Sequence, residues 1–466
     1  MMQTIKRLPV LFIALFITIC GYGQEGFVHE KSSNYQWPTD SATLKKLDKW
    51  QDLKFGVLFH WGLYSVPGIV ESWSICSEDQ DWIPRDSTIA YTDYKEWYWN
   101  LKDEFNPTDF DPAQWSRICK EAGMKYSLFT TKHHDGFCLW DTQETDFSIM
   151  NGPFGKDPRA DLAKGVFDAF RNDHFMVGAY FSKPDWNCEY YWWPRYATAT
   201  RNVNYNIKNH PAQWEKFQKF TYNQIQELMN EYGSIDILWL DGGWVAAPRQ
   251  DIKMDEIAAM ARKAQPGLLI VDRLIHGPNE NYQTPERSIP NEQLPNPWES
   301  CIPLSDDWGW TPEANFKSSQ TIVANLIEIV AKGGCLALGV GPTPQGLIQP
   351  EVETILSEIG SWLEQNGKAI YETRTLPYYQ SENVWFTQNI KKKETYAIYA
   401  LAEDDTLSST ISWEGNLPEV GSTLRLVSTG DKLKYSIEGN KVKVKLPRAV
   451  VDKQESFAIS YPTISK

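Results

Sequence analysis

The stretch IDILWLDGG, at residues 235–243, joins a nearly continuous apolar run to an aspartate and two glycines. Such a run is typical of a parallel strand that is buried on both faces of its sheet. Similar runs, each followed by an amphipathic stretch, occur elsewhere in the chain: KFGVLF at 54–59, YSLFT at 126–130, MVGAYF at 176–181, LLIV at 268–271 and CLALGV at 335–340. This alternation of strand and helix predicts an α/β fold, specifically a (β/α)8-like TIM barrel.

A doubly wound open sheet is the alternative arrangement for the same pattern. No G-x-G-x-x-G motif or P-loop follows any of the apolar runs, which favours the barrel. Amphipathic periodicity predicts helices between and after the runs, at 111–122, 211–232, 254–264, 318–332 and 352–365. After residue 366 the chain changes to short alternating segments separated by turn residues. This second pattern predicts a C-terminal antiparallel β-sandwich.

The first residues have the pattern of an export signal. Lys6 and Arg7 precede an apolar segment at 8–19, and Gly21-Tyr22-Gly23 offers small residues for cleavage before residue 24. The twelve residues of this segment are too few to span a bilayer, which needs about 20. We expect a periplasmic or extracellular protein with no membrane span. A lipid anchor at Cys20 is the lesser alternative, because the bulky Ile19 precedes it.

The expected organisation is therefore a signal peptide at 1–23, a catalytic barrel at 24–368 and a β-sandwich at 369–466. The chain has 466 residues and a formal net charge of −14, which argues against a nucleic-acid partner, since phosphate binding needs a basic face. Its 21 Trp, 22 Tyr and 20 Phe permit, without proving, a surface that stacks on sugars. Disulfide pairing among its six cysteines beyond residue 23, and its oligomeric state, do not follow from the sequence.

Polar residues follow four of the predicted strands at the point where each strand ends. His60 follows the first strand, His133 and His134 the second, Asp241 the fourth and Arg273 the fifth. Barrel enzymes build their active sites at the carboxyl ends of the strands. These endings therefore predict one site on one rim of the barrel.

Carboxylates and aromatic side chains at a barrel rim are the groups that glycoside hydrolases use to cleave and bind sugars. Asp241 is the best candidate nucleophile, and Trp239, two residues earlier, points to the same side of the strand. The competing interpretation is a zinc site formed by His60, His133 or His134 with Asp241. No H-x-H motif occurs, and adjacent histidines on a strand face opposite ways, so no metal or other cofactor is expected.

Several blocks in order resemble the α-L-fucosidases of glycoside hydrolase family 29. They lie at 54–67 (KFGVLFHWGLYSVP), 96–98 (EWY), 132–137 (KHHDGF), 140–141 (WD), 239–242 (WLDG), 298–301 (WESC), 339–343 (GVGPT) and 366–371 (NGKAIY). The resemblance implies a barrel followed by a β-sandwich and a retaining, metal-free hydrolysis of terminal α-L-fucose from oligosaccharides or glycoconjugates. It places the nucleophile on Asp241 and the contacts to fucose on His60, Glu96, Trp97, His133, His134, Trp239 and Arg273. The family commonly has tyrosine before the serine of the third strand, and here Phe181 takes that place.

The general acid/base has two candidates, because the family does not keep it at one position. Glu286 and Glu299 both fall in a segment rich in proline and asparagine, which we expect to be a loop over the rim. Trp298 offers Glu299 an apolar wall that would raise its pKa, and this slightly favours Glu299.

Three alternative functions remain open from the sequence. They are a barrel glycosidase that acts on another sugar such as galactose, a non-catalytic carbohydrate-binding protein, and the metal-dependent hydrolase. The aromatic segment WNCEYYWWPRY at 186–196 could line the leaving-group side of the site or serve only as packing.

Overall fold

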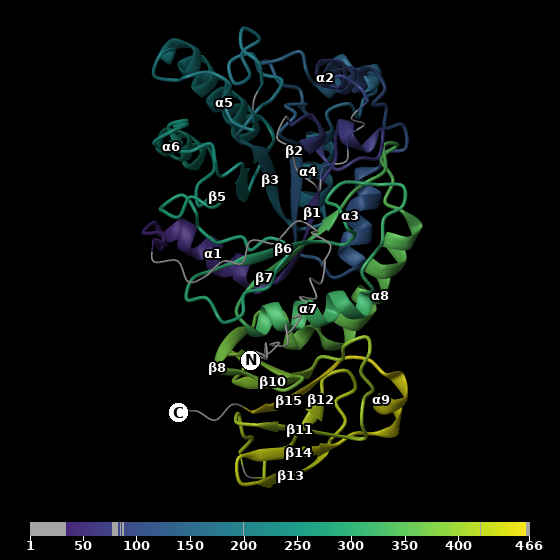
Figure 1. The fold of residues 1–466 in the computed structure, drawn as a ribbon. Helices are drawn as coiled ribbons and strands as arrows, with labels where there is room; N and C mark the ends of the chain where they lie inside the picture. Colours follow the sequence, from purple (N-terminus) through teal and green to yellow (C-terminus); the bar gives the residue numbers. More distant parts are fainter. Residues whose placement is uncertain are drawn as a thin grey trace, which may run out of the picture.

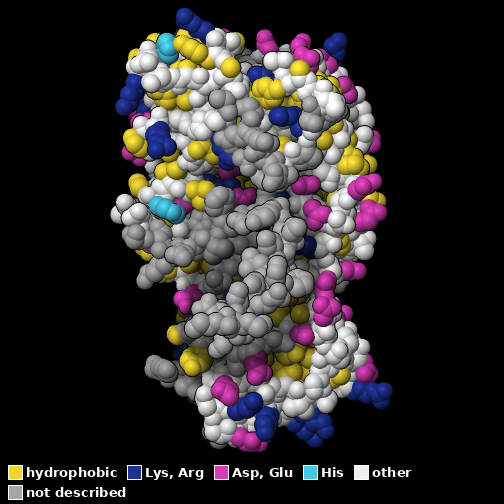
Figure 2. Space-filling model, in the orientation of Figure 1, with side chains coloured by type: hydrophobic (Ala, Val, Ile, Leu, Met, Phe, Trp, Pro, Cys, Tyr) yellow, Lys and Arg dark blue, Asp and Glu magenta, His cyan; other side chains and the backbone are white. Residues whose placement is uncertain are grey.

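The computed structural model describes residues 34–76, 83, 85, 88–198, 200–419 and 421–462. The predicted signal peptide at 1–23 and its alternative, an anchor at Cys20, lie outside these residues. Within the described ranges, no helix combines the length and the apolar character that crossing a membrane requires. Figure 2 shows basic side chains scattered among acidic ones on one face of the molecule.

The larger part of the molecule is built on a seven-stranded parallel sheet with the order β5-β4-β3-β2-β1-β7-β6 (Figure 1). Its residues are buried along almost their whole length, as the continuous apolar runs predict. All six predicted strands are present, with ends that differ by at most two residues. The strands are β1 (Phe55–Phe59), β2 (Tyr126–Lys132), β3 (Met176–Ser182), β4 (Ile237–Asp241), β5 (Leu269–Asp272), β6 (Glu299–Pro303) and β7 (Cys335–Val340).

Helices cover the outer side of this sheet. Asp111 caps α3 as predicted, because its side chain accepts hydrogen bonds from the backbone N–H groups of Ala113 and Gln114. The helices are α1 (Ser41–Leu53), α2 (Tyr91–Asn100), α3 (Pro112–Glu121), α4 (Leu162–Asn172), α5 (Pro211–Glu231), α6 (Met254–Ala264), α7 (Ser319–Ala331) and α8 (Pro350–Asn366).

Strand β6 corrects the sequence prediction, which placed residues 299–303 in a rim loop. The strand pairs with β7 in parallel register from Glu299↔Cys335 to Pro303↔Gly339. Its sequence ESCIP is short and polar at its start, and prolines stand at 297 and 303, so it lacks the apolar run that marks the other strands. Long-range pairing with β7 overrides this weak local preference.

The segment at 279–287 lies between the two edge strands, β5 and β6. On one side, the N–H of Asn281 donates to Ile270 O of β5 at 2.8 Å. On the other side, the N–H of Cys301 in β6 donates to Pro285 O at 3.0 Å. The described sheet therefore has seven regular strands and an irregular connection, rather than the eight regular strands of the expected barrel, and proline within the connection limits its ladder hydrogen bonds.

The C-terminal part contains two antiparallel sheets that share one hydrophobic core. Phe386 of the larger sheet contacts Trp413 of the smaller, with ring centroids 6.1 Å apart. This arrangement agrees with the predicted sandwich. The larger sheet contains β8 (Arg374–Ser381), β9 (Val384–Asn389), β10 (Glu394–Tyr399), β12 (Arg425–Leu426) and β15 (Phe457–Pro462), and the smaller contains β11 (Thr410–Glu414), β13 (Lys434–Glu438) and β14 (Lys441–Lys445).

The two parts pack together below α7 and α8 (Figure 1). Trp362 of α8 donates its indole N–H to Ser456 O at 2.7 Å, and Asn366 accepts from Ala458 N–H at 3.1 Å. The sandwich thus supports the side of the sheet formed by β6 and β7, away from the loops that follow β3 and β4.

Candidate active site

Asp241 ends β4, and three side chains from neighbouring strands converge on its carboxylate. The Tyr180 hydroxyl donates to Oδ2 at 2.6 Å, and Arg273 donates from Nη1 to Oδ1 at 2.9 Å. His134 Nε2 lies 3.8 Å from Oδ2. Burial alone would raise the pKa of Asp241, but the charge of Arg273 and the Tyr180 hydrogen bond outweigh it and hold the pKa well below its ordinary value. Asp241 is therefore an ionised carboxylate.

Gly242, directly after Asp241, lets the chain turn away from the rim. Its φ is +86°, and a Cβ at this position would lie 2.3 Å from Pro184 Cδ. Only glycine fits both the backbone conformation and the space. The turn leaves the Asp241 carboxylate at the mouth of the sheet.

His60, His133 and His134 form a histidine cluster beside Asp241. The ring centroids of His133 and His134 are 4.3 Å apart, and those of His60 and His133 are 5.7 Å apart. We expected the adjacent histidines to face opposite ways, and the structure corrects this. Both residues follow the last residue of β2, Lys132, so the alternation of a strand does not apply to them.

Serines orient two of these imidazoles. His133 Nδ1 lies 2.5 Å from Ser72 Oγ, and His134 Nδ1 is hydrogen-bonded to Ser182 Oγ. Burial lowers the pKa of His133 to about 4 and holds the pKa values of His60 and His134 well below their ordinary value. Neutral imidazoles can both donate hydrogen bonds to sugar hydroxyls and accept them.

The group His133, His134 and Asp241 also has the composition of a metal site, with one candidate ligand atom from each residue lying within 4.8 Å of the others. However, Asp241 Oδ1 is already held by the Arg273 guanidinium, and Oδ2 by the Tyr180 hydroxyl. A second cation at this carboxylate would be repelled by Arg273. The residues present therefore suit a sugar better than a metal ion.

Arg273 also joins Asp241 to the first acid/base candidate. Its Nη2 forms an ion pair with Glu286 Oε2, and Trp308 donates its indole N–H to Glu286 Oε1 at 3.2 Å. Glu286 lies beside Cys301 of β6. One guanidinium thus contacts two carboxylates at the rim.

The second candidate, Glu299, lies at the other end of the sheet. It is the first residue of β6, whereas Asp241 is the last residue of β4, and the strands are parallel. Its side chain is fully buried and accepts from the Trp239 indole N–H at 3.1 Å. Burial raises the pKa of Glu299 to about 7. The expectation that Glu299 overhangs the rim is corrected by the pairing of β6 with β7.

Two of the predicted sugar contacts, Glu96 and Trp97, lie outside this cluster. They occupy an exposed face of α2, and Trp97 is 40% exposed. The buried face of α2 carries Tyr98, which donates to Asp135 at 2.7 Å and so fixes which way the helix faces. Trp239 is a third difference: it is buried beneath Tyr180 and Arg273 rather than open to a ligand.

The structure also brings in residues that the sequence analysis did not select. Ser72 and Trp73 lie in a short 3-10 turn (Ser72–Ile75), and Trp73 packs against His134 with centroids 5.0 Å apart. Trp308 packs against His60 at 5.0 Å. Tyr180 supplies the contact to Asp241 that Phe181 does not. The sequence signal for Trp73 is its place a few residues after the first family block.

The aromatic segment at 186–196 contacts the site through its first residue. Trp186 packs against His134 and Trp73, with centroids 5.2 and 5.5 Å away. Trp192 stacks on Trp186 with ring centroids 5.1 Å apart, and it is 5% exposed. Packing therefore accounts for Trp192, while Trp186 borders the site.

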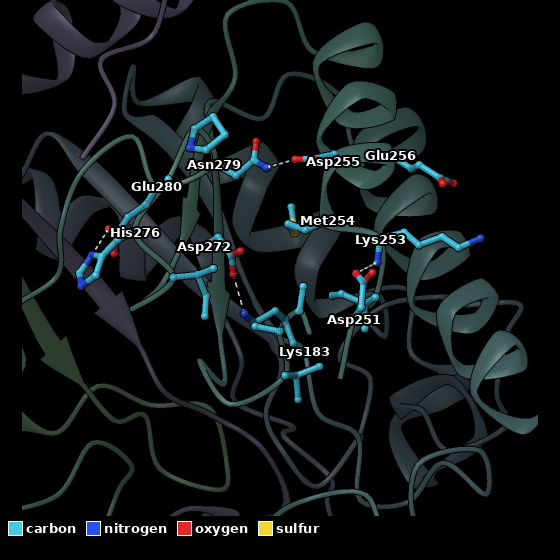
Figure 3. Close-up of a pocket in the computed structure, with 17 residues that line it drawn as sticks. Lys183, Asp251, Lys253, Met254, Asp255, Glu256, Asp272, His276, Asn279 and Glu280 are labelled. Carbon is cyan, nitrogen blue, oxygen red and sulfur yellow. Dashed lines mark hydrogen bonds and ion pairs between the residues drawn. The ribbon is translucent and has the colours of Figure 1, made fainter. Parts of the chain in front are cut away.

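A separate cavity of about 480 Å³ lies beside this rim, between the start of α6 and the loop after β5 (Figure 3). Lys183 and Asp272 form a buried ion pair of 2.5 Å in its wall. The residues adjoin the site through the backbone, since Lys183 N–H donates to Asp241 O at 3.0 Å and Asp272 precedes Arg273. The cavity thus backs the two strand ends and includes none of the side chains around the Asp241 carboxylate.

Comparisons with known proteins identify the family of this chain. A family model described as alpha-L-fucosidase matches residues 24–368. The plasma alpha-L-fucosidase of Homo sapiens is 29% identical over 454 residues, which cover 88% of each chain. The structure of alpha-L-fucosidase isoenzyme 1 from Paenibacillus thiaminolyticus is 27% identical, with a TM-score of 0.77 over 91% of this chain and 100% of that chain.

A structure of the Thermotoga maritima alpha-fucosidase in complex with fucose is 25% identical, with a TM-score of 0.71 over 91% of this chain and all of that chain. The match of the family model over most of the chain settles the family. This glycoside hydrolase belongs to the α-L-fucosidase family, glycoside hydrolase family 29.

Proposed function

We propose that the protein is an exo-acting, retaining α-L-fucosidase that removes terminal α-L-fucose from oligosaccharides or glycoconjugates. The observation that supports this best is the contact of one guanidinium, Arg273, with both Asp241 and Glu286. Retaining glycosidases place their two carboxyl groups about 5–5.5 Å apart. The guanidinium that binds both carboxylates holds them beside each other at the same rim.

In the first step, a carboxylate oxygen of Asp241 forms a bond to C1 of fucose as the bond from C1 to the leaving oxygen breaks. Glu286, in its protonated form, gives its proton to the leaving oxygen. The Arg273–Glu286 ion pair must therefore loosen as the substrate enters. In the second step, Glu286 takes a proton from water, whose oxygen displaces Asp241 from C1 and releases fucose with its original configuration.

The neutral histidine cluster fits the binding of the sugar hydroxyls. His60, His133 and His134 offer imidazole nitrogens without adding charge beside Asp241. Trp73 and Trp308, which pack against this cluster, are the apolar surfaces on which the C6 methyl group of fucose would rest. Burial of that methyl group contributes roughly 0.8 kcal/mol and favours fucose over a sugar with a hydroxymethyl group.

Trapping with a 2-fluoro-fucosyl fluoride tests this proposal directly. We expect the reagent to label Asp241 and the protein to cleave an aryl α-L-fucoside with α-L-fucose as the first product seen by NMR. An aryl β-D-galactoside, cleaved more slowly, serves as the control substrate. A label on another residue, or first release of β-L-fucose, would overturn the mechanism.

The role of Glu286 has its own test. We expect Glu286→Ala to lose most of its rate on a poor leaving group and to keep more of it on a dinitrophenyl fucoside. Azide should restore that rate and yield α-L-fucosyl azide, because azide needs no base to attack the fucosyl-enzyme. No azide product from this variant would exclude Glu286 as the acid/base.

A further inference from the structure

We propose that Glu299 is a positioning residue, which holds the nucleophile Asp241 in place through the indole ring of Trp239. This inference rests on the proposed role of Asp241. It assigns a function in the reaction to a carboxyl group that lies at the opposite end of the sheet from the chemistry.

The first link is the hydrogen bond between Glu299 and Trp239. The indole N–H can only donate, and it donates to Glu299 Oε1 at 3.1 Å. Both side chains are buried, with Trp239 1% and Glu299 0% exposed. A buried donor that loses its acceptor pays the full desolvation penalty of an unpaired polar group. Without Glu299, the buried indole N–H would be unpaired, which favours a shift of the ring toward another acceptor.

The second link is the packing of the Trp239 ring against both groups that hold Asp241. Tyr180 stacks on the ring at 5.1 Å with an interplanar angle of 23°, and the Arg273 guanidinium lies 5.0 Å from its centroid. These are the two side chains that donate to Asp241, at 2.6 and 2.9 Å. A shift of the indole would therefore move both donors together.

The third link is the rigid support beneath Glu299. Trp50 stacks on Tyr282 at 4.0 Å and contacts Tyr126 at 6.3 Å, and both tyrosines interact with Glu299. The carboxyl group thus lies between these aromatic side chains below and Trp239, to which it is hydrogen-bonded, above. The same arrangement prevents Glu299 from reaching a glycosidic oxygen, because it lies beneath the buried indole.

The test compares Glu299→Leu with Glu299→Gln, which keeps an oxygen for the indole N–H. We expect kcat on an aryl fucoside to fall by about 100-fold in Glu299→Leu, since a misplacement of about 1 Å can cost that much. Glu299→Gln should stay within about threefold of wild type, as expected for a group that only accepts a hydrogen bond. The loss in Glu299→Leu should be the same for good and poor leaving groups, and azide should not restore it.

The pH profile supplies a readout that a general loss of structure would not move. In Glu299→Leu, the acidic limb of kcat should shift upward, because Tyr180 and Arg273 no longer hold the pKa of Asp241 as low. The basic limb, which reports the acid/base, should remain. Formation of fucosyl azide by Glu299→Leu would instead make Glu299 the acid/base and overturn the proposal, as would unchanged activity.

Trp239→Phe keeps the test valid if Glu299→Leu does not fold. It removes the indole N–H but keeps an aromatic ring, so we expect a similar upward shift of the acidic limb. Where Glu299→Leu does fold, adding it to Trp239→Phe should change the rate no further, and an additive effect would contradict the link. A wild-type protein without fucosidase activity, or an active Asp241→Ala, would show that the proposed function itself fails.

Discussion

The two ends of the parallel sheet each hold a carboxyl group, and the two groups have opposite properties. Asp241 at the carboxyl end contacts a guanidinium and a phenol, and its pKa is lowered. Glu299 at the amino end accepts a hydrogen bond from the Trp239 indole N–H and has no ion pair among the described residues. Burial raises its pKa to about 7. Burial raises the pKa of both groups, and the direct contact of Arg273 with Asp241 makes that carboxyl group the ionised one.

The largest effect should come from removing the nucleophile. Asp241→Asn keeps the shape of the side chain but cannot form the fucosyl-enzyme, so we expect kcat to fall by roughly 10⁴-fold or more. Steady-state hydrolysis of an aryl α-L-fucoside measures it. Glu299→Gln is the matched control at the other end of the sheet, and an equal loss there would erase the contrast between the two carboxyl groups.

Replacing the cation Arg273 should raise the pKa of Asp241, as burial raises the pKa of Glu299. In Arg273→Met, burial acts on Asp241 without its main compensation, so the pKa of Asp241 should rise and the acidic limb of kcat should move to higher pH. We expect kcat at neutral pH to fall by about 10²- to 10³-fold, the range for loss of one preorganised electrostatic contact in an active site. An acidic limb that stays in place would show that Arg273 does not control the Asp241 pKa.

Glu299 should make the stability of the protein depend on pH. Its folded pKa of about 7 lies above the ordinary 4.5. The stability that the protonated group contributes is therefore fully present below pH 4.5 and is lost as the pH rises to 7. Wild type should lose stability relative to Glu299→Gln across this window, by an amount on the order of 3 kcal/mol. Urea unfolding of both proteins between pH 4.5 and 8 measures the difference, and a constant difference would contradict the raised pKa.

The contrast between the two ends also explains what the sequence could predict. Six strands were predictable because buried parallel strands are continuous apolar runs, and the rule that sites lie at their carboxyl ends brought His60, His133, His134, Asp241 and Arg273 together. Strand β6 was not predictable, because ESCIP, which ends in Pro303 and follows Pro297 closely, has no such run and forms by pairing with β7. Because β6 was not predictable, the sequence could not place Glu299 at the amino end of the sheet and Glu286 at the rim formed by the carboxyl ends.

The smallest effect should separate two tryptophans, of which the sequence analysis selected Trp97 and not Trp73. Trp97 is 40% exposed on α2, whereas Trp73 packs 5.0 Å from His134 at the carboxyl end of the sheet. Trp97→Ala should therefore change kcat/KM on an aryl fucoside by less than about twofold, as surface substitutions usually do. Trp73→Ala, its matched control, should raise KM by about fourfold through the lost apolar contact with the sugar. A larger effect at Trp97 than at Trp73 would mean that α2 approaches the sugar when substrate binds, and that the rim includes more than the strand ends.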